Sequence, residues 1–147
     1  MNLHDQKMNF SSAHFVIGAD SCEALHGHNY HVEVTLTGPL NHQGMVMDFR
    51  DLKERVLQVC SQLDHRVLLP GKSDEISIHV TESAVKVEVR ARHYEFPAED
   101  CAILPIKATT AELLAEFIAS KLQIPDGYSF ELCVSENVGS RGCYSSN

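Results

Sequence analysis

The ten residues from Cys22 to His31, C-E-A-L-H-G-H-N-Y-H, bring together a thiol, a carboxylate and three imidazoles. His26 and His28 lie two positions apart, and such residues of a strand point to the same face, so their imidazoles can converge on one ion. Gly27 between them leaves the reverse face free and eases close approach of the backbone. Neutral imidazole is a good zinc ligand. Pairs of solvated histidines show the same spacing, so the pattern alone leaves both interpretations open.

A catalytic zinc site needs three protein ligands and an open position, so a third ligand must come from another segment. His14 lies on a preceding apolar stretch, on the face of Phe10 and Ser12. An antiparallel neighbour of the His26–His28 strand would present His14 opposite His28. Three histidines suit iron or nickel as well as zinc. The remaining histidines are weaker candidates because they lie on the other strand face, at the terminus, in a turn or in a separate hairpin: His31, His4, His42, His79 and His93.

Two further positions carry groups that can move protons. Cys22 lies in a loop four residues before His26, where a nearby metal would acidify its thiol, although a structural cysteine is the alternative. Asp64 and His65 follow a predicted helix, and the aspartate could orient the histidine as an acid–base group. A histidine at this place also interacts favourably with the helix dipole, so the sequence leaves both roles open.

Length, composition and charge limit the class of protein. A chain of 147 residues with 44% apolar and 22% charged residues predicts one globular domain, residues 1–147. The net charge of −8 and the lack of a basic run argue against a nucleic-acid partner. The sequence shows no membrane-spanning apolar run and no signal-peptide pattern, which predicts a cytoplasmic protein with no membrane partner. Five cysteines without a C-x-x-C pair argue against a disulfide framework and predict mostly small buried side chains.

Alternating and helical patterns predict the elements that position these residues. Residues 8–17 and 28–37 predict two strands of an antiparallel pair, joined by the loop that contains Cys22. Asp48 caps a predicted helix over residues 49–63, whose apolar residues recur at spacings of three and four.

The second half of the chain continues the alternation of strands and helix. Four segments predict strands, of which the first three form an extra hairpin or small meander: 76–80, 84–90, 92–96 and 128–135. Thr109 and Glu112 have the spacing of a capping box, which predicts that a second helix begins there. The order of elements is that of an α+β fold with a largely antiparallel sheet.

Six segments occur together in one order: F-S-S-A-H, C-E-A-L-H-G-H-N-Y, G-M-V-M-D-F, L-D-H-R, T-T-A-E-L-L-A and the tail that begins at Glu136. In this combination the chain, from about residue 8 to 144, resembles the 6-pyruvoyltetrahydropterin synthase and 6-carboxytetrahydropterin synthase family. The resemblance implies the tunnelling fold (T-fold), with a four-stranded antiparallel sheet and two helices on one face. It also implies barrel-forming trimers that stack into a homo-hexamer, with active sites at subunit interfaces.

The resemblance further implies a zinc-dependent lyase that acts on 7,8-dihydroneopterin triphosphate to give 6-carboxy- or 6-pyruvoyl-tetrahydropterin with loss of triphosphate. The matching zinc ligands are His14, His26 and His28. The matching catalytic residues are Cys22, Asp64 and His65, and the matching substrate-binding residues are Glu136 and Thr110. Lys107 and Arg66 are candidates for contacts with the triphosphate, with surface placement as the alternative.

The sequence departs from the compact bacterial members of the family at two places. Residues 72–106 are longer and hold the extra strands. Glu23 directly follows Cys22, and similar relatives with E-x-x-H-G-H cleave the side chain to give 6-hydroxymethyl-7,8-dihydropterin, a folate precursor. The sequence therefore leaves three functions open: the synthase, the aldolase-like cleavage alone or in addition to it, and a non-catalytic pterin- or metal-binding protein.

Overall fold

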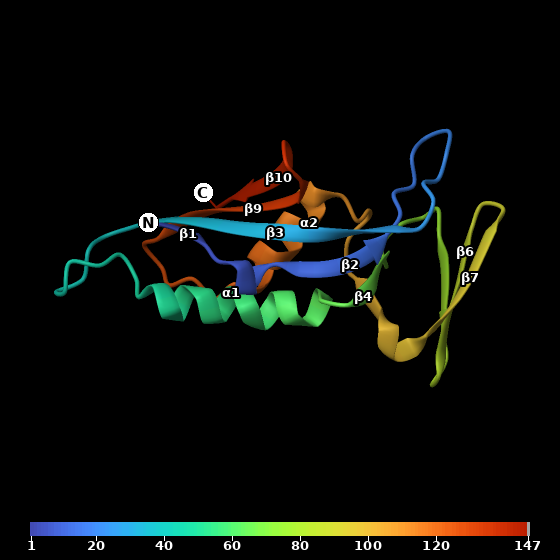
Figure 1. Ribbon diagram of the computed structural model, residues 1–147, viewed down its shortest axis with the longest axis horizontal. Coiled ribbons are helices and arrows are strands. Elements are labelled where there is room, and N and C mark those ends of the chain that lie inside the picture. Colours follow the sequence, from blue (N-terminus) through green and yellow to red (C-terminus); the bar gives the residue numbers. More distant parts are fainter. Residues whose placement is uncertain (147) are drawn as a thin grey trace.

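The computed structural model describes residues 1–146, which form a seven-stranded sheet, a smaller three-stranded sheet and two long helices (Figure 1). The strands of the large sheet run in the order β10-β9-β3-β2-β4-β8, and β1 pairs alongside β3. Their bounds are Asn2–His4 for β1, Phe10–His14 for β2, His26–Thr37 for β3, Arg66–Pro70 for β4, Cys101–Leu104 for β8, Ser129–Asn137 for β9 and Ser140–Ser145 for β10. A single-turn 3-10 helix, Gln6–Met8, joins β1 to β2.

The long strand β3 organises the core because its alternate residues from Tyr30 to Leu36 are apolar. Tyr30, Val32, Val34 and Leu36 are each 0% exposed, as the alternation predicts. Helices α1 (Phe49–Leu63) and α2 (Ala111–Lys121) bury their apolar stripes in the same hydrophobic cluster as these four side chains. Both helices therefore cover one face of the sheet, and the bounds of α1 are those that the sequence predicts. No helix within residues 1–146 is long and apolar enough to cross a membrane.

The expectation of a four-stranded antiparallel sheet is wrong in two respects. The sheet has seven strands, and β4 pairs parallel with both β2 and β8. Three consecutive residues of β4, Leu68 to Pro70, are buried, so this strand lacks the alternation by which a half-exposed strand is recognised. The two predicted strands at the site also differ in length, since β2 is shorter than residues 8–17 and β3 begins at His26.

The three-stranded sheet confirms the extra hairpin expected between residues 76 and 96. Its strands are β5 (Ser77–Val80), β6 (Ala84–Val89) and β7 (Arg92–Pro97), in the order β5-β6-β7. The buried side chains of β6 pack against Phe15 and Leu69 of the main body, in a second hydrophobic cluster. This sheet stands at the end of the molecule to which the loop between β2 and β3 reaches (Figure 1).

One pair of cysteines departs from the expectation of mostly small, buried, unpaired side chains, since it forms a disulfide. Cys133 of β9 and Cys143 of β10 are direct cross-strand partners, with Cα atoms 4.1 Å apart, and their sulfurs are bonded. The three other cysteines are free: Cys60 is buried, whereas Cys22 and Cys101 are partly exposed.

A three-histidine candidate metal centre

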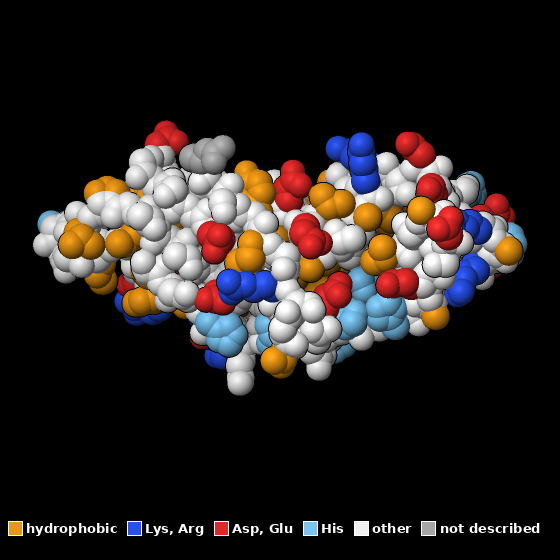
Figure 2. Space-filling model, turned by 90° about the horizontal axis from the view of Figure 1, so that it is seen from above, with side chains coloured by type: hydrophobic (Ala, Val, Ile, Leu, Met, Phe, Trp, Pro, Cys, Tyr) orange, Lys and Arg blue, Asp and Glu red, His pale blue; other side chains and the backbone are white. Residues whose placement is uncertain are grey.

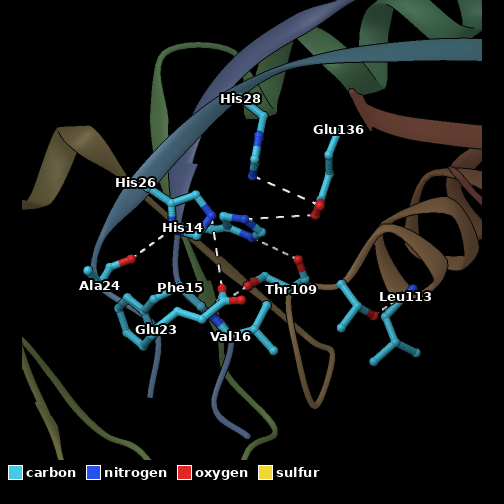
Figure 3. Close-up of polar contacts among 11 residues, drawn as sticks. His14, Phe15, Val16, Glu23, Ala24, His26, His28, Thr109, Leu113 and Glu136 are labelled. Atoms are coloured by element: carbon cyan, nitrogen blue, oxygen red, sulfur yellow. Dashed lines mark hydrogen bonds and ion pairs between the residues drawn. The ribbon is translucent and has the colours of Figure 1, made fainter. Parts of the chain in front are cut away.

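Three histidines from two adjacent strands converge on one point (Figure 3). His14 on β2 and His26 and His28 on β3 have ring centroids between 4.7 and 5.2 Å apart. One ring nitrogen of each lies within 4.8 Å of the other two. The pairing register places His14 opposite His26, whereas His28 faces Ser12, so the sequence-based expectation of a His14–His28 pair was wrong by two residues. The convergence itself is as predicted.

Backbone carbonyls fix the tautomers of two of these rings. Nδ1 of His14 lies 2.9 Å from the carbonyl oxygen of Thr109, and Nδ1 of His26 lies 2.7 Å from that of Ala24. Because a carbonyl oxygen only accepts hydrogen bonds, each Nδ1 carries the proton and each Nε2 presents a lone pair. This arrangement, in which the second nitrogen is held by a carbonyl, is typical of histidines that bind metal ions.

The Nε2 atom of His14 shows that these residues fit a metal ion. The side chain is 1% exposed, and its Nε2 has no hydrogen-bond partner within the described residues. Burial lowers the pKa of His14, against smaller opposing effects of the Thr109 carbonyl and Glu136, so the ring is held neutral. A buried lone pair without a partner is costly, and a bound cation would satisfy it.

Glu136 of β9 faces the histidine cluster from the opposite side (Figure 3). Its carboxylate oxygens lie 3.8 Å from Nε2 of His14 and 3.9 Å from Nε2 of His28, which is too far for hydrogen bonds. Glu136 also lines a cleft of about 400 Å³ with Thr110 at the start of α2 and with the β9–β10 hairpin. The carboxylate therefore stands between the histidines and a cavity that could hold a small molecule.

The two adjacent threonines before α2 have different tasks. Thr110 is the residue that caps the helix, since its side chain accepts a hydrogen bond from the backbone N–H of Leu113. The expected cap at Thr109 is therefore wrong. Thr109 is buried, donates its hydroxyl to the carbonyl oxygen of Phe15, and orients His14 through its own carbonyl. Sequence reasoning missed this supporting role because it depends on a backbone atom.

Cys22 and Glu23 are neighbours in sequence but have different surroundings. One carboxylate oxygen of Glu23 accepts a hydrogen bond from the backbone N–H of Val16 and lies 3.9 Å from Nε2 of His26 (Figure 3). Cys22 forms a backbone bridge with Ile17, and its side chain packs at the border of the second hydrophobic cluster. The structure therefore brings Glu23, rather than Cys22, into direct range of a histidine.

Asp64 and His65 form a pair beyond the end of α1. One oxygen of Asp64 accepts a hydrogen bond from the backbone N–H of Ser11, and the other lies 2.9 Å from Nδ1 of His65. Partial burial acts to raise the pKa of Asp64, but these two hydrogen bonds outweigh it and hold the pKa below its usual range. His65 is largely exposed and has a φ of 57°, in the left-handed region.

This Asp64–His65 pair shares a cleft with His28 but, in the described part of the chain, has no direct bond to the other predicted residues. His65 lines a cleft of about 550 Å³ with Ser11, the triphosphate candidate Arg66 and the candidate ligand His28. No hydrogen bond or ion pair within residues 1–146 links the pair to Cys22 or to the three histidines. Lys107, the second triphosphate candidate, lines a separate cleft of about 280 Å³.

On the face seen in Figure 2, histidine side chains gather beside acidic ones toward the end that carries the smaller sheet.

Comparison with known proteins identifies relatives over most of the chain. Residues 5–136 match the 6-pyruvoyl tetrahydropterin synthase family. The chain is 34% identical over 147 residues to a putative 6-carboxy-5,6,7,8-tetrahydropterin synthase of Methanocaldococcus jannaschii, a match that covers 93% of this chain and 89% of that protein. A shorter match, 40% identical over 62 residues, relates 42% of the chain to 53% of a dihydroneopterin monophosphate aldolase of Pyrococcus furiosus.

A solved structure shares the fold over the full length. The 6-pyruvoyltetrahydropterin synthase of Plasmodium vivax superposes with a TM-score of 0.93 at 30% identity, over 100% of this chain and 96% of that one. That protein was solved as a variant in which a catalytic glutamate is replaced by alanine.

Proposed function

The chain belongs to the 6-pyruvoyl tetrahydropterin synthase family, and we propose that it is a zinc-dependent lyase acting on 7,8-dihydroneopterin triphosphate. The products would be 6-carboxy- or 6-pyruvoyl-tetrahydropterin, with loss of triphosphate. The observation that carries the proposal is the cluster of His14, His26 and His28, in which Nε2 of His14 is buried without a partner. A solvated pair of histidines would not leave such an atom.

The three histidines are the proposed zinc ligands, and His14 and His26 would bind through the Nε2 atoms that their carbonyl contacts leave free. A zinc ion held there supplies a Lewis acid for the hydroxyl groups of the substrate side chain and acidifies the adjacent C–H bond.

The cleft beside the cluster is the proposed pterin site. Glu136 and Thr110 line this cleft of about 400 Å³ together, although they lie 26 positions apart in sequence. A carboxylate such as that of Glu136 can accept two parallel hydrogen bonds, from the 2-amino group and the ring N–H of a pterin. Because Glu136 also faces His14 and His28, a ring held by it would direct its side chain toward the histidines.

Cys22 and the Asp64–His65 pair are the proposed acid–base groups of the synthase reaction. The thiolate of Cys22 would remove a proton from the substrate side chain, and His65, oriented by Asp64, would return one. Since no hydrogen bond or ion pair within residues 1–146 joins the pair to Cys22, we assign it to the site of a neighbouring copy in a homo-hexamer.

A second candidate is side-chain cleavage to 6-hydroxymethyl-7,8-dihydropterin, with Glu23 as the base. The specific observation is the position of its carboxylate, 3.9 Å from Nε2 of His26 and fixed by the N–H of Val16. Relatives add support, since one is a dihydroneopterin monophosphate aldolase and another has a catalytic glutamate.

Product analysis separates these candidates. The zinc-loaded protein, with Cys22→Ala and Glu23→Gln variants in parallel, is incubated with 7,8-dihydroneopterin triphosphate, and the pterins are identified by mass spectrometry. Loss of the carboxy or pyruvoyl product only in Cys22→Ala supports the synthase, and loss of the hydroxymethyl product only in Glu23→Gln supports the cleavage. If the wild-type protein binds the pterin but forms no product, it is a binding protein and both lyase proposals are wrong.

Mixing of inactive variants tests the assignment of Asp64 and His65 to a neighbouring copy. Cys22→Ala and Asp64→Asn chains are refolded together, and each preparation is also refolded alone as a control. In sites shared between copies, about one quarter contain both intact halves, so activity returns to about that fraction of the wild-type value. Mixed assemblies as inactive as the controls would place the whole site within one chain.

A further inference from the structure

The turn between β6 and β7 holds an arginine in a conformation that favours glycine. Val89 pairs with Arg92, so Arg90 and Ala91 alone form the turn. Arg90 has a φ of 53°, in the left-handed region, and hairpin turns of this length use mostly glycine, asparagine or aspartate there. An arginine is disfavoured because its Cβ crowds the backbone carbonyl. Strained residues of this kind cluster at functional sites.

The side chain of Arg90 reaches from this turn to the loop between β2 and β3. Its Nη2 donates hydrogen bonds to the carbonyl oxygens of Gly18 and Ala19, the second at 3.2 Å. The same Nη2 atom lies 3.4 Å from a carboxylate oxygen of Glu75. Glycine, which would fit the turn better, could make none of these contacts.

The two carbonyls belong to the tip of the loop that carries the proposed catalytic residues. The N–H of Gly18 donates to the carbonyl oxygen of Ser21, which closes the tip. Behind the tip, Cys22 forms a bridge with Ile17, and the N–H of Glu23 donates to the carbonyl oxygen of Val16. The tip residues are exposed, and the two hydrogen bonds of Arg90 link them to the smaller sheet.

The rest of the smaller sheet supplies a rigid base for this link. Tyr94 stacks on Phe15, the residue after the ligand His14, with ring centroids 5.5 Å apart, and Phe96 stacks on Tyr94 at 5.7 Å. Arg92 donates a hydrogen bond to the Tyr94 hydroxyl at 3.5 Å, and the partly buried Ile17 and Cys22 of the loop pack against the cluster that contains the buried side chains of β6. The β6–β7 hairpin thus lies close to the catalytic loop at more than one point.

We propose that Arg90 is a positioning residue: it ties the tip of the loop, Gly18 to Ser21, to the smaller sheet and so fixes the positions of Cys22 and Glu23, which directly follow the tip. The smaller sheet, residues 77 to 97, then serves catalysis through this tie. The catalytic consequence rests on the proposed function, whereas the tie itself concerns only the conformation of the loop.

The test compares Arg90→Gly, Arg90→Lys and the wild-type protein, with Arg50→Ala as the matched control. Arg50 is an exposed arginine that contacts Asp48 at the other end of the molecule, so its removal leaves the loop unchanged. The first readout is the alkylation rate of Cys22 by iodoacetamide at pH 8 without zinc, followed by peptide mapping. Burial raises the pKa of the Cys60 thiol to about 12 and also raises that of Cys101, so both react slowly and serve as internal references.

In Arg90→Gly, iodoacetamide is expected to alkylate Cys22 about fivefold faster than in the wild-type protein. Loss of one ordinary hydrogen bond raises the population of the open loop by about this factor. Amide hydrogen exchange of residues 18–23 should also become faster in Arg90→Gly, and Arg90→Lys should give an intermediate alkylation rate. The unfolding temperature of Arg90→Gly should stay within about 3 °C of the wild-type value because glycine suits the turn. Turnover falls through kcat, while KM changes less than about twofold because Arg90 does not line the pterin cleft.

Three results would overturn the proposal. Unchanged alkylation and exchange in Arg90→Gly would show that the arginine does not hold the loop. Faster alkylation of Cys60 and Cys101 together with Cys22 would show general loosening of the fold. Faster alkylation of Cys22 with unchanged kcat would show that the tie has no part in catalysis. Absence of turnover in the wild-type protein would instead contradict the proposed function, and the zinc-free readouts would still test the tie.

Discussion

Removal of His14 should abolish the stabilisation of the protein by zinc. A ligand that binds only the folded state at a concentration of a hundred times Kd adds about 2.7 kcal/mol to the free energy of unfolding. For a chain of this length, 1 kcal/mol raises the unfolding temperature by about 2–4 °C, so zinc should raise that of the wild-type protein by about 5–10 °C. If His14→Ala lowers the affinity a hundredfold, the same zinc concentration equals the new Kd and adds only about 0.4 kcal/mol, or roughly 1 °C.

Thermal unfolding with EDTA or with zinc measures this difference within each variant, which cancels any effect of the substitution on the metal-free protein. His31→Ala is the matched control, since His31 belongs to the same ten-residue stretch and contacts Asn9 on the other face of β3. It should keep the full shift. A shift of equal size in His14→Ala, or its loss in His31→Ala, would refute the placement of the metal at the three histidines.

Three further predictions concern stability. The pKa of Asp64 is lowered in the folded state, so its contribution to the free energy of unfolding is present above pH 3.8 and is lost as the pH falls below that value. Asp64→Asn should therefore flatten the acid side of a plot of urea midpoint against pH. Parallel plots for the variant and the wild-type protein would contradict this. Reduction of the Cys133–Cys143 disulfide, or Cys143→Ser, should lower the free energy of unfolding by about 2–3 kcal/mol, which is measured as a lower guanidinium midpoint. A midpoint that does not change in dithiothreitol would contradict this prediction. Gly142→Ala places a Cβ 2.3 Å from the backbone nitrogen of Glu112 in α2, so it should lower the free energy of unfolding by about 1–3 kcal/mol and weaken pterin binding in a fluorescence titration. The control is Gly44→Ala at an open turn, which should leave the pterin affinity unchanged.

The three-histidine cluster was predictable because a strand has a fixed period of two. That period placed His26 and His28 together and His31 on the other face, and the structure agrees. The partner of His14 was not predictable, because the register of an antiparallel pair depends on the loop between the strands, and this loop forms its own hydrogen bonds. A shift of two residues in the register leaves every side chain on the same face of the strand. The prediction that the three histidines converge therefore held although the predicted partner of His14 was wrong.

Elements with a strong local signal were predicted better than those defined by tertiary pairing. Helix α1 follows from its cap at Asp48 and its apolar spacing, whereas two adjacent threonines left the start of α2 ambiguous by one residue. Strand β10 is short and polar, and it exists because it pairs with β9. The Cys133–Cys143 disulfide depends on that same pairing, so no cysteine spacing could have indicated it.

The loop between β2 and β3 carries both proposed bases, Cys22 and Glu23, and their surroundings differ. Glu23 is held by the N–H of Val16 within range of His26, so its carboxylate is positioned by its own chain. Cys22 lies at the border of the second hydrophobic cluster, and its proposed partners Asp64 and His65 stand in another cleft. Under the proposed assignment of Asp64 and His65 to a neighbouring copy, chemistry that uses Cys22 requires that copy, whereas chemistry that uses Glu23 does not. If both activities are present, dilution that dissociates the assembly should abolish the carboxy or pyruvoyl product before it abolishes the hydroxymethyl product.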